Sequence, residues 1–156
     1  MDKKCTPIVF FKSFGVFSAN VDRWNYYYLY MPSIAVIDFG SANTSCYLKE
    51  DERHKGIRVF TMHCLTPVPE MECNDRWMHL RNTEIDNEEV SRKMDEIFRL
   101  AFYEDKVVLE AIQNEESGPF NQQIISLAID KTPNVYRLRI RPMIENELNK
   151  NRQSSY

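Results

Sequence analysis

The stretch that decides the fold is FRLAFYEDKVVLEAIQ, from Phe98 to Gln113. Apolar residues recur in it at steps of three and four, and they continue a pattern that starts upstream at Val90 and Met94. This spacing predicts one long amphipathic helix. Asp105 falls on the same helix face as the apolar residues, whereas the other charged residues fall on the flanks or the far side. We therefore expect Asp105 to point inward.

A carboxylate on an apolar helix face requires compensation, because an isolated buried charge destabilises the fold by several kcal/mol. Asp105 either meets an arginine or a backbone amide across the core, or it is a metal ligand or an acid/base group in a cavity. The spacing alone leaves these alternatives open.

Length and composition predict one ordinary domain. The chain has 156 residues, 43% of them apolar, which suffices for one hydrophobic core, so we expect a single domain over residues 1–156. The net charge is -3 and no dense run of Lys and Arg occurs, so neither nucleic acid nor a membrane surface is an expected partner. No run approaches the roughly 20 apolar residues of a membrane span, and no signal-peptide cleavage site follows the N-terminus. A cytoplasmic location is the resulting expectation.

The cysteines are expected to be free thiols, because nothing else in the sequence indicates a secreted disulfide scaffold. They are Cys5, Cys46, Cys64 and Cys73. Close Cys and His pairs, which iron-sulfur and structural zinc sites require, are missing from the sequence. A zinc site assembled across strands from Cys46, His63 and Cys73 is kept as an alternative.

The sequence before the helix reads as strands and turns. We expect strands over 5–17, over two runs within 24–40 that are separated by Pro32, and over a hairpin of 56–67 and 71–82. Pro67 and Pro69 belong to the connection or edge of that hairpin, because proline cannot donate a ladder hydrogen bond. Polar turns are expected at 41–45 and 49–56.

Two helices are expected after the strands. The first begins near Asp86, whose carboxylate can cap its first turn, and it ends before residues 114–119. The second begins with Thr132 as cap and Pro133 at its first position, and Pro142 forces a kink or a late start. Strands followed by helices predict an α+β domain in which a curved antiparallel sheet packs on the long helix. Asp105 then points into the cavity between them.

Three stretches carry a resemblance to a known family. They are VDRWNYYYLYMPSIAVIDFGSA (21–42), GIRVFTMHCLTPVPEMECNDRWMHLRN (56–82) and AFYEDKVVLEAIQ (101–113). In the same order, they resemble the C-terminal part of the oxygenase component of Rieske-type non-haem iron oxygenases, in the branch that includes vanillate O-demethylase. The resemblance covers about residues 20–113 and, more weakly, the tail IDKTPNVYRLRIRP. It implies a helix-grip fold and a partial catalytic domain.

The resemblance also implies a role for Asp105. In that family, two His and one carboxylate hold a mononuclear iron, and a [2Fe-2S] Rieske centre supplies electrons. Asp105 matches the carboxylate ligand, whereas the two His lie on an upstream helix that this chain does not contain, and His63 does not match them. We therefore expect no Rieske domain and no cofactor in this chain. The parent reaction is dioxygen-dependent hydroxylation or O-demethylation of an aromatic acid, and we expect the chain alone to be inactive.

A different class of function keeps the fold without the oxygen chemistry. In this alternative, the chain is a helix-grip module that binds a small apolar or aromatic ligand in a cavity lined by Trp24, Tyr26, Tyr28, Met94 and Phe102. A third alternative is that the chain is a broken reading frame, or a fragment of an enzyme that works only with a separate N-terminal half. A homo-oligomer is also expected, because the apolar segment 8–17 resembles an exposed sheet edge.

Overall fold

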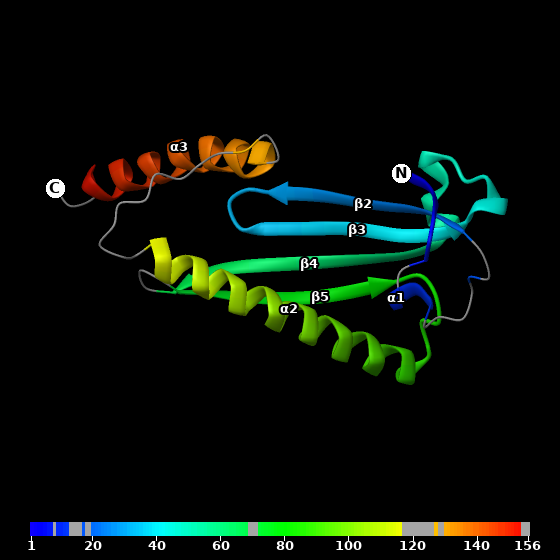
Figure 1. The fold of residues 1–156 in the computed structure, drawn as a ribbon. Coiled ribbons are helices and arrows are strands. Elements are labelled where there is room, and N and C mark those ends of the chain that lie inside the picture. The colour runs from blue at the N-terminus through cyan, green and yellow to red at the C-terminus, as the bar shows by residue number, and fades with distance from the viewer. Residues whose placement is uncertain are drawn as a thin grey trace. The chain divides into compact units, whose positions relative to one another are not determined.

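The computed structural model describes residues 1–7, 9–12, 17, 20–68, 72–116, 127 and 130–153. The chain divides into two compact units, Met1–Val108 and Leu109–Tyr156. The first unit contains the sheet and most of the long helix (Figure 1). The candidate site lies in this first unit.

Five strands form one antiparallel sheet whose order along the sheet equals their order along the chain (Figure 1). They are β1 (Asp2–Cys5), β2 (Val21–Tyr30), β3 (Ile34–Asn43), β4 (Ile57–Val68) and β5 (Glu72–Arg81). The two predicted runs around Pro32 are confirmed as the β2–β3 hairpin, and the predicted hairpin of 56–67 and 71–82 is confirmed as β4 and β5. Pro67 lies near the end of β4, opposite Cys73, while Pro69 lies outside the described residues.

The first predicted strand, 5–17, is wrong in its described part. Strand β1 ends at Cys5, and α1 (Val9–Lys12) is a short helix whose Phe11 is buried in the core. A run that is apolar at nearly every position has no period that separates a strand from a helix. Since residues 9–12 are helical, the sheet edge on which we based the homo-oligomer is not formed there. Residues 8, 13–16, 18 and 19 lie outside the described part of the chain.

The polar segments after β3 are more ordered than expected. Strand β3 continues through Asn43, so the predicted turn at 41–45 begins later, with the 3-10 helix η1 (Thr44–Cys46). A second 3-10 helix, η2 (Glu50–Lys55), takes the place of the predicted polar turn at 49–56.

Strand residues alternate between two faces of the sheet, and each face has its own core cluster. On the helix face, which carries the odd-numbered residues of β3, β4 and β5, Ile57 and Val59 pack with Phe11 and with Met94 of the long helix. On the opposite face, Trp24 of β2 packs with Ala42 and Leu48. The Trp24 ring lies against Gly40, where an added Cβ atom would come 2.2 Å from Trp24 Cζ2. Glycine at this position therefore lets the indole lie flat on the sheet.

The long helix, α2 (Glu88–Glu116), lies on one face of the sheet in Figure 1. Its cap is Asn87 and not Asp86, because the side chain of Asn87 accepts a hydrogen bond from the backbone N–H of Val90 at 3.2 Å. Arg81 fixes the loop before it, since its Nη2 donates to the backbone oxygens of Glu84 and Asn87 at 2.7 and 3.0 Å. The predicted α+β class is confirmed, and a curved antiparallel sheet with one long helix is consistent with the helix-grip arrangement.

In the second unit, α3 extends over Lys131–Gln153. It begins before Thr132, so Thr132 and Pro133 lie in its first turn rather than at the cap and first position. A proline is tolerated there, because the first N–H groups of a helix have no intrahelical partner. Pro142 lies inside α3 and does not delay its start. None of the helices in the described ranges is long and apolar enough to span a membrane.

Candidate functional site

A cluster of aromatic and histidine rings holds α2 against the helix face of β4 and β5. Phe98 stacks on His79 with ring centroids 3.7 Å apart and an interplanar angle of 20°. One turn later, Phe102 makes edge contacts with His63 at 5.0 Å and with Trp77 at 5.1 Å. The predicted apolar stripe is therefore confirmed for this part of α2.

His79 is the more enclosed histidine of the cluster. Its Nδ1 lies 2.8 Å from Oγ1 of the buried Thr61, and its Nε2 is buried without a hydrogen-bonding partner among the described residues. The pKa of His79 is lowered to about 4, mainly by burial and also by the neighbouring His63, whereas Asp95 opposes the shift. The imidazole is therefore neutral at neutral pH and packs as an uncharged ring against Phe98.

His63 differs from His79 because it is paired with a carboxylate. Its Nδ1 lies 2.8 Å from Asp75 Oδ2, and 13% of the His63 side chain and 38% of the Asp75 side chain are exposed. This pair was not predicted from the sequence, in which His63 was considered only as a metal ligand. The register of the β4–β5 hairpin could have predicted the pair. His63 lies opposite Trp77, and Asp75 is the neighbouring residue of β5 on the same face of the sheet.

The side chain of Asp105 is exposed, so the expectation that it points inward is wrong for the described residues. Its neighbours along the predicted stripe are exposed as well, with values of 58% for Val108, 64% for Leu109 and 49% for Ile112. The periodicity identified residues that share a helix face, but it did not reveal that the Asp105 side chain is exposed. No arginine pairs with Asp105 in the described part of the chain. Its role as an iron ligand stays a prediction.

The five residues predicted to line a cavity lie on two different faces of the sheet. Trp24, Tyr26 and Tyr28 alternate along β2 and lie on the opposite face, whereas Met94 and Phe102 of α2 contact the helix face. Trp24 and Met94 are core residues with 3% and 4% exposure, and Tyr28 is 40% exposed. Spacing along one strand predicts a shared face but not which face the helix covers. Contact of these residues with a ligand stays a prediction.

A buried charge network on the opposite face was not predicted. Asp38 of β3 is fully buried and accepts two hydrogen bonds from Arg58, at 2.8 and 2.7 Å, and one from Trp24 Nε1, at 3.2 Å. Arg53 of η2 adds a second cation, with its Nη1 at 3.3 Å from the same carboxylate. The hydrogen bonds with Asp38 hold the pKa of Arg58 above its usual value. A buried carboxylate paired with arginine, which was one alternative for Asp105, is thus found at Asp38.

Tyr26 belongs to the same network. Its hydroxyl donates to Glu50, and this hydrogen bond raises the pKa of Tyr26. The guanidinium of Arg53 lies 4.3 Å from the centre of the Tyr26 ring. Tyr26 therefore attaches η2 to the sheet.

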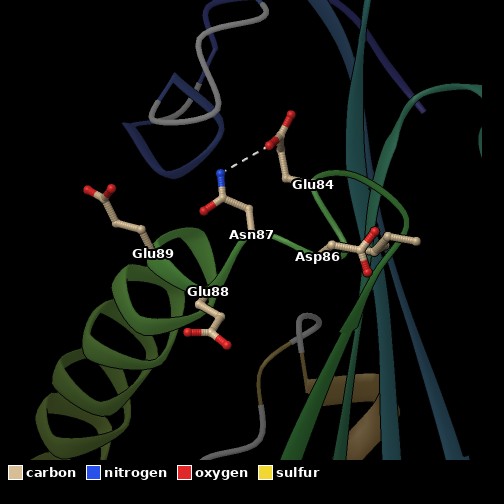
Figure 2. Close-up of a pocket in the computed structure, with 6 residues that line it drawn as sticks. Glu84, Asp86, Asn87, Glu88 and Glu89 are labelled. Atoms are coloured by element: carbon tan, nitrogen blue, oxygen red, sulfur yellow. Dashed lines mark hydrogen bonds between the residues drawn. The ribbon is translucent and has the colours of Figure 1, made fainter.

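An acidic concave surface lies at the start of α2. It is lined by Glu84, Ile85, Asp86, Asn87, Glu88 and Glu89. Figure 2 shows that the carboxylates point in different directions, and that Asn87 donates to Glu84, at 3.1 Å between Nδ2 and Oε2. Since the carboxylates diverge, this surface does not form a coordination site.

The described residues do not fit the metal sites considered from the sequence. No group of three His, Cys, Asp or Glu side chains within the described ranges could hold a metal ion. A site with two histidines and one carboxylate is therefore not assembled there, and neither is the zinc alternative with Cys46, His63 and Cys73. The four cysteines are free thiols.

A curved antiparallel sheet with a long helix on one face defines a helix-grip type of α+β domain. Residues 3–146 match the model of the vanillate O-demethylase oxygenase C-terminal domain family. The chain therefore belongs to this family, and the resemblance found in the sequence is confirmed.

Two curated relatives are similar to most of the chain, and both come from Comamonas testosteroni. The putative toluene-4-sulfonate monooxygenase system iron-sulfur subunit TsaM2 is 28% identical over 121 residues, and the subunit TsaM1 of the toluene-4-sulfonate monooxygenase system is 27% identical over 121 residues. Each alignment covers 76% of this chain and 35% of the relative. The chain thus spans about a third of the length of the curated relatives it matches. No solved structure matches the chain.

Proposed function

We propose that this chain forms part of the catalytic domain of a Rieske-type non-haem iron oxygenase. The proposed reaction is dioxygen-dependent hydroxylation or O-demethylation of an aromatic acid. The observation that carries this proposal is the match of residues 3–146 to the vanillate O-demethylase oxygenase family. The two relatives support it, because their names describe iron-sulfur subunits of a monooxygenase system for an aromatic sulfonate.

The complete enzyme of this proposal contains iron and a [2Fe-2S] cluster. Asp105 supplies one ligand to that iron, and the remaining ligands and the cluster come from polypeptide outside the described residues, in a separate N-terminal half or elsewhere in a longer chain. No catalytic step follows from the described residues, because they do not assemble the iron site. The chain alone is inactive in this proposal, and its partners are the other components of an oxygenase system.

In this proposal, an aromatic substrate contacts exposed apolar side chains on the helix face of the sheet. Leu29 of β2 and Leu65 of β4 are 44% and 40% exposed, and both lie on the same face as His63. Apolar surface with few polar groups is typical of small-molecule sites. The residues in this region differ from the aromatic set predicted from the sequence.

A chimeric subunit tests the proposal. Residues 3–146 replace the matching segment of the Comamonas testosteroni TsaM1 subunit, and the product is assayed for oxygen-dependent conversion of toluene-4-sulfonate with a reductase that supplies electrons. We expect conversion by the chimera, and a loss of about a hundredfold or more in turnover after Asp105→Ala, because groups that only support a metal ligand already contribute about 10–100-fold and Asp105 is a direct ligand in this proposal. The control is Glu104→Gln, which changes an exposed carboxylate next to Asp105.

The chimera must first show the visible absorption of its iron-sulfur cluster, since this establishes that the rest of the subunit is folded. A chimera with an intact cluster that converts no substrate would contradict the proposal and favour a ligand-binding module. Equal turnover of the Asp105→Ala chimera and its parent would remove Asp105 from the iron site.

A further inference from the structure

The face of the sheet opposite α2 carries an apolar surface that crosses four strands. We call six of its residues the outer apolar face: Tyr28 of β2, Ile34 and Val36 of β3, Met62 of β4, and Met78 and Leu80 of β5. Four of them form one row, since Tyr28 pairs with Val36, Val36 with Met62, and Met62 with Met78. The row therefore forms a continuous apolar band across the sheet.

The outer apolar face is largely uncovered by the described part of the chain. Four of its side chains, those of Tyr28, Ile34, Met78 and Leu80, are between 38% and 61% exposed. An antiparallel sheet with one face toward water normally alternates apolar core residues with polar surface residues. In this sheet, the strands are apolar toward the outer face as well as toward the core cluster on the helix face. This pattern is typical of a sheet that is covered on both faces.

The charge distribution on this side of the sheet favours an apolar cover. None of the six residues of the outer apolar face carries a charge. Arg58, which borders them, donates two hydrogen bonds to Asp38, at 2.8 and 2.7 Å, and its guanidinium lies 4.4 Å from the centre of the Phe60 ring. A flat apolar surface placed over this face therefore buries no unpaired charge, whereas a nucleic acid or a charged peptide would find no partner groups among the six residues.

We propose that the chain forms a two-fold symmetric dimer in which the outer apolar faces of two copies pack against each other. Packed sheets lie about 10 Å apart and interdigitate their side chains, so a second flat apolar sheet is a suitable cover. A two-fold interface uses the same surface on both copies, and the outer apolar face meets this condition because it is apolar throughout. The dimer does not depend on the proposed oxygenase reaction.

The exposed area is sufficient for a weak dimer. The outer apolar face and the side chains beside it present on the order of 600 Å² per copy, so two copies bury about 1,200 Å², which is the lower limit for a specific and stable interface. Affinity in interfaces of such sizes begins in the micromolar range. We therefore expect a dissociation constant of about 1–10 µM.

Sedimentation velocity of the full chain, at concentrations from well below to well above this dissociation constant, tests the inference. We expect the wild type to change from monomer to dimer over this range. Leu80→Lys should weaken dimerisation by about a hundredfold or more, because a two-fold interface receives the unpaired lysine twice. The control is Leu100→Lys on α2, which packs on the other face, since Leu100 is 62% exposed and Leu80 is 61% exposed. Dimerisation of this control should equal that of the wild type.

Methionine oxidation in the wild type tests the same contact without a substitution. Hydrogen peroxide converts accessible methionine to the sulfoxide, and mass spectrometry gives the rate for each site. Met78 belongs to the outer apolar face and is 50% exposed, while Met143 of α3 is 42% exposed and serves as the reference. We expect the rate at Met78, relative to that at Met143, to fall in proportion to the fraction of dimer as the protein concentration rises.

Three results would overturn the inference: a monomer well above the expected dissociation constant, a folded Leu80→Lys variant that dimerises like the wild type, or a relative Met78 rate that does not change with concentration. A Met78 rate that is slow even in the monomer would show that the chain covers this face itself. Urea unfolding establishes whether Leu80→Lys is folded, and if it is not, the Met78 rates decide alone. An inactive chimera would contradict only the proposed oxygenase reaction and leave the dimer unaffected.

Discussion

Replacement of Asp38 by Asn should destabilise the fold strongly. Asp38 is fully buried, while its partners Arg58 and Arg53 keep only 23% and 16% of their side chains exposed. Removing one partner of a buried ion pair costs about 3–5 kcal/mol, because the remaining charge is left uncompensated. We expect about 3 kcal/mol, at the lower end, because both arginine side chains keep some exposure and the Asn oxygen can still accept from Trp24.

Urea unfolding followed by tryptophan fluorescence measures this loss. At a typical urea dependence of about 1–3 kcal/mol per molar for a small protein, the transition midpoint should fall by about 1 M or more. The matched control is Asp95→Asn, since Asp95 bonds Arg99 at 2.7 Å on the surface, with the two side chains 46% and 68% exposed. Its midpoint should match that of the wild type, because an exposed pair is screened by water. Equal midpoints for Asp38→Asn and the wild type would refute the assignment of Asp38 as a structural ion pair.

Two further predictions concern His79 and Asp105. The pKa of His79 is about 4 in the folded protein, below the ordinary value of 6.5. As the pH falls, His79 of the unfolded chain therefore binds a proton before His79 of the folded protein does. The stability contributed by neutral His79 is complete above about pH 6.5 and is lost as the pH falls toward 4. We expect this loss of stability to be about 1–2 kcal/mol after allowance for solvent screening. The difference in urea midpoints between pH 7 and pH 5 should be smaller in His79→Phe than in the wild type. Equal differences in the two proteins would show that His79 does not cause the pH dependence. Asp105→Asn should leave the urea midpoint unchanged, because the carboxylate is exposed in this chain, and a clear loss would reveal a partner outside the described residues.

The sequence was sufficient for those parts of the fold that depend on local pattern. Pro32 between two β-branched and aromatic runs predicted the β2–β3 hairpin, and the three- and four-residue spacing predicted α2. The segment 5–17 was misread, because an apolar residue at nearly every position removes the period on which the distinction depends. The cap of α2 was placed one residue early, since Asp86 and Asn87 are both good capping residues and only the folded loop selects between them.

The site was less predictable, because its contacts join residues from different strands. Asp38, Arg53 and Arg58 meet only when β3, η2 and β4 are in register, and no local spacing links them. The inward carboxylate was consequently sought at Asp105, where the helix pattern was visible. Family resemblance supplied the identity of the domain, but it could not show whether the face that carries Asp105 is covered in this chain.

The Asp38–Arg58 pair and the Asp75–His63 pair differ in the property that separates a structural pair from a binding group. Asp38 is enclosed, and its oxygens are occupied by Arg58 and Trp24 on the opposite face, so it has no capacity left for a ligand. The pair of His63 and Asp75 keeps part of its surface in contact with water, and one imidazole nitrogen is without a described partner. A polar group that is held in place but not saturated can bind a ligand without first breaking an internal bond. Under the proposed function, the helix face is therefore the surface to test for substrate contact before the more strongly charged opposite face.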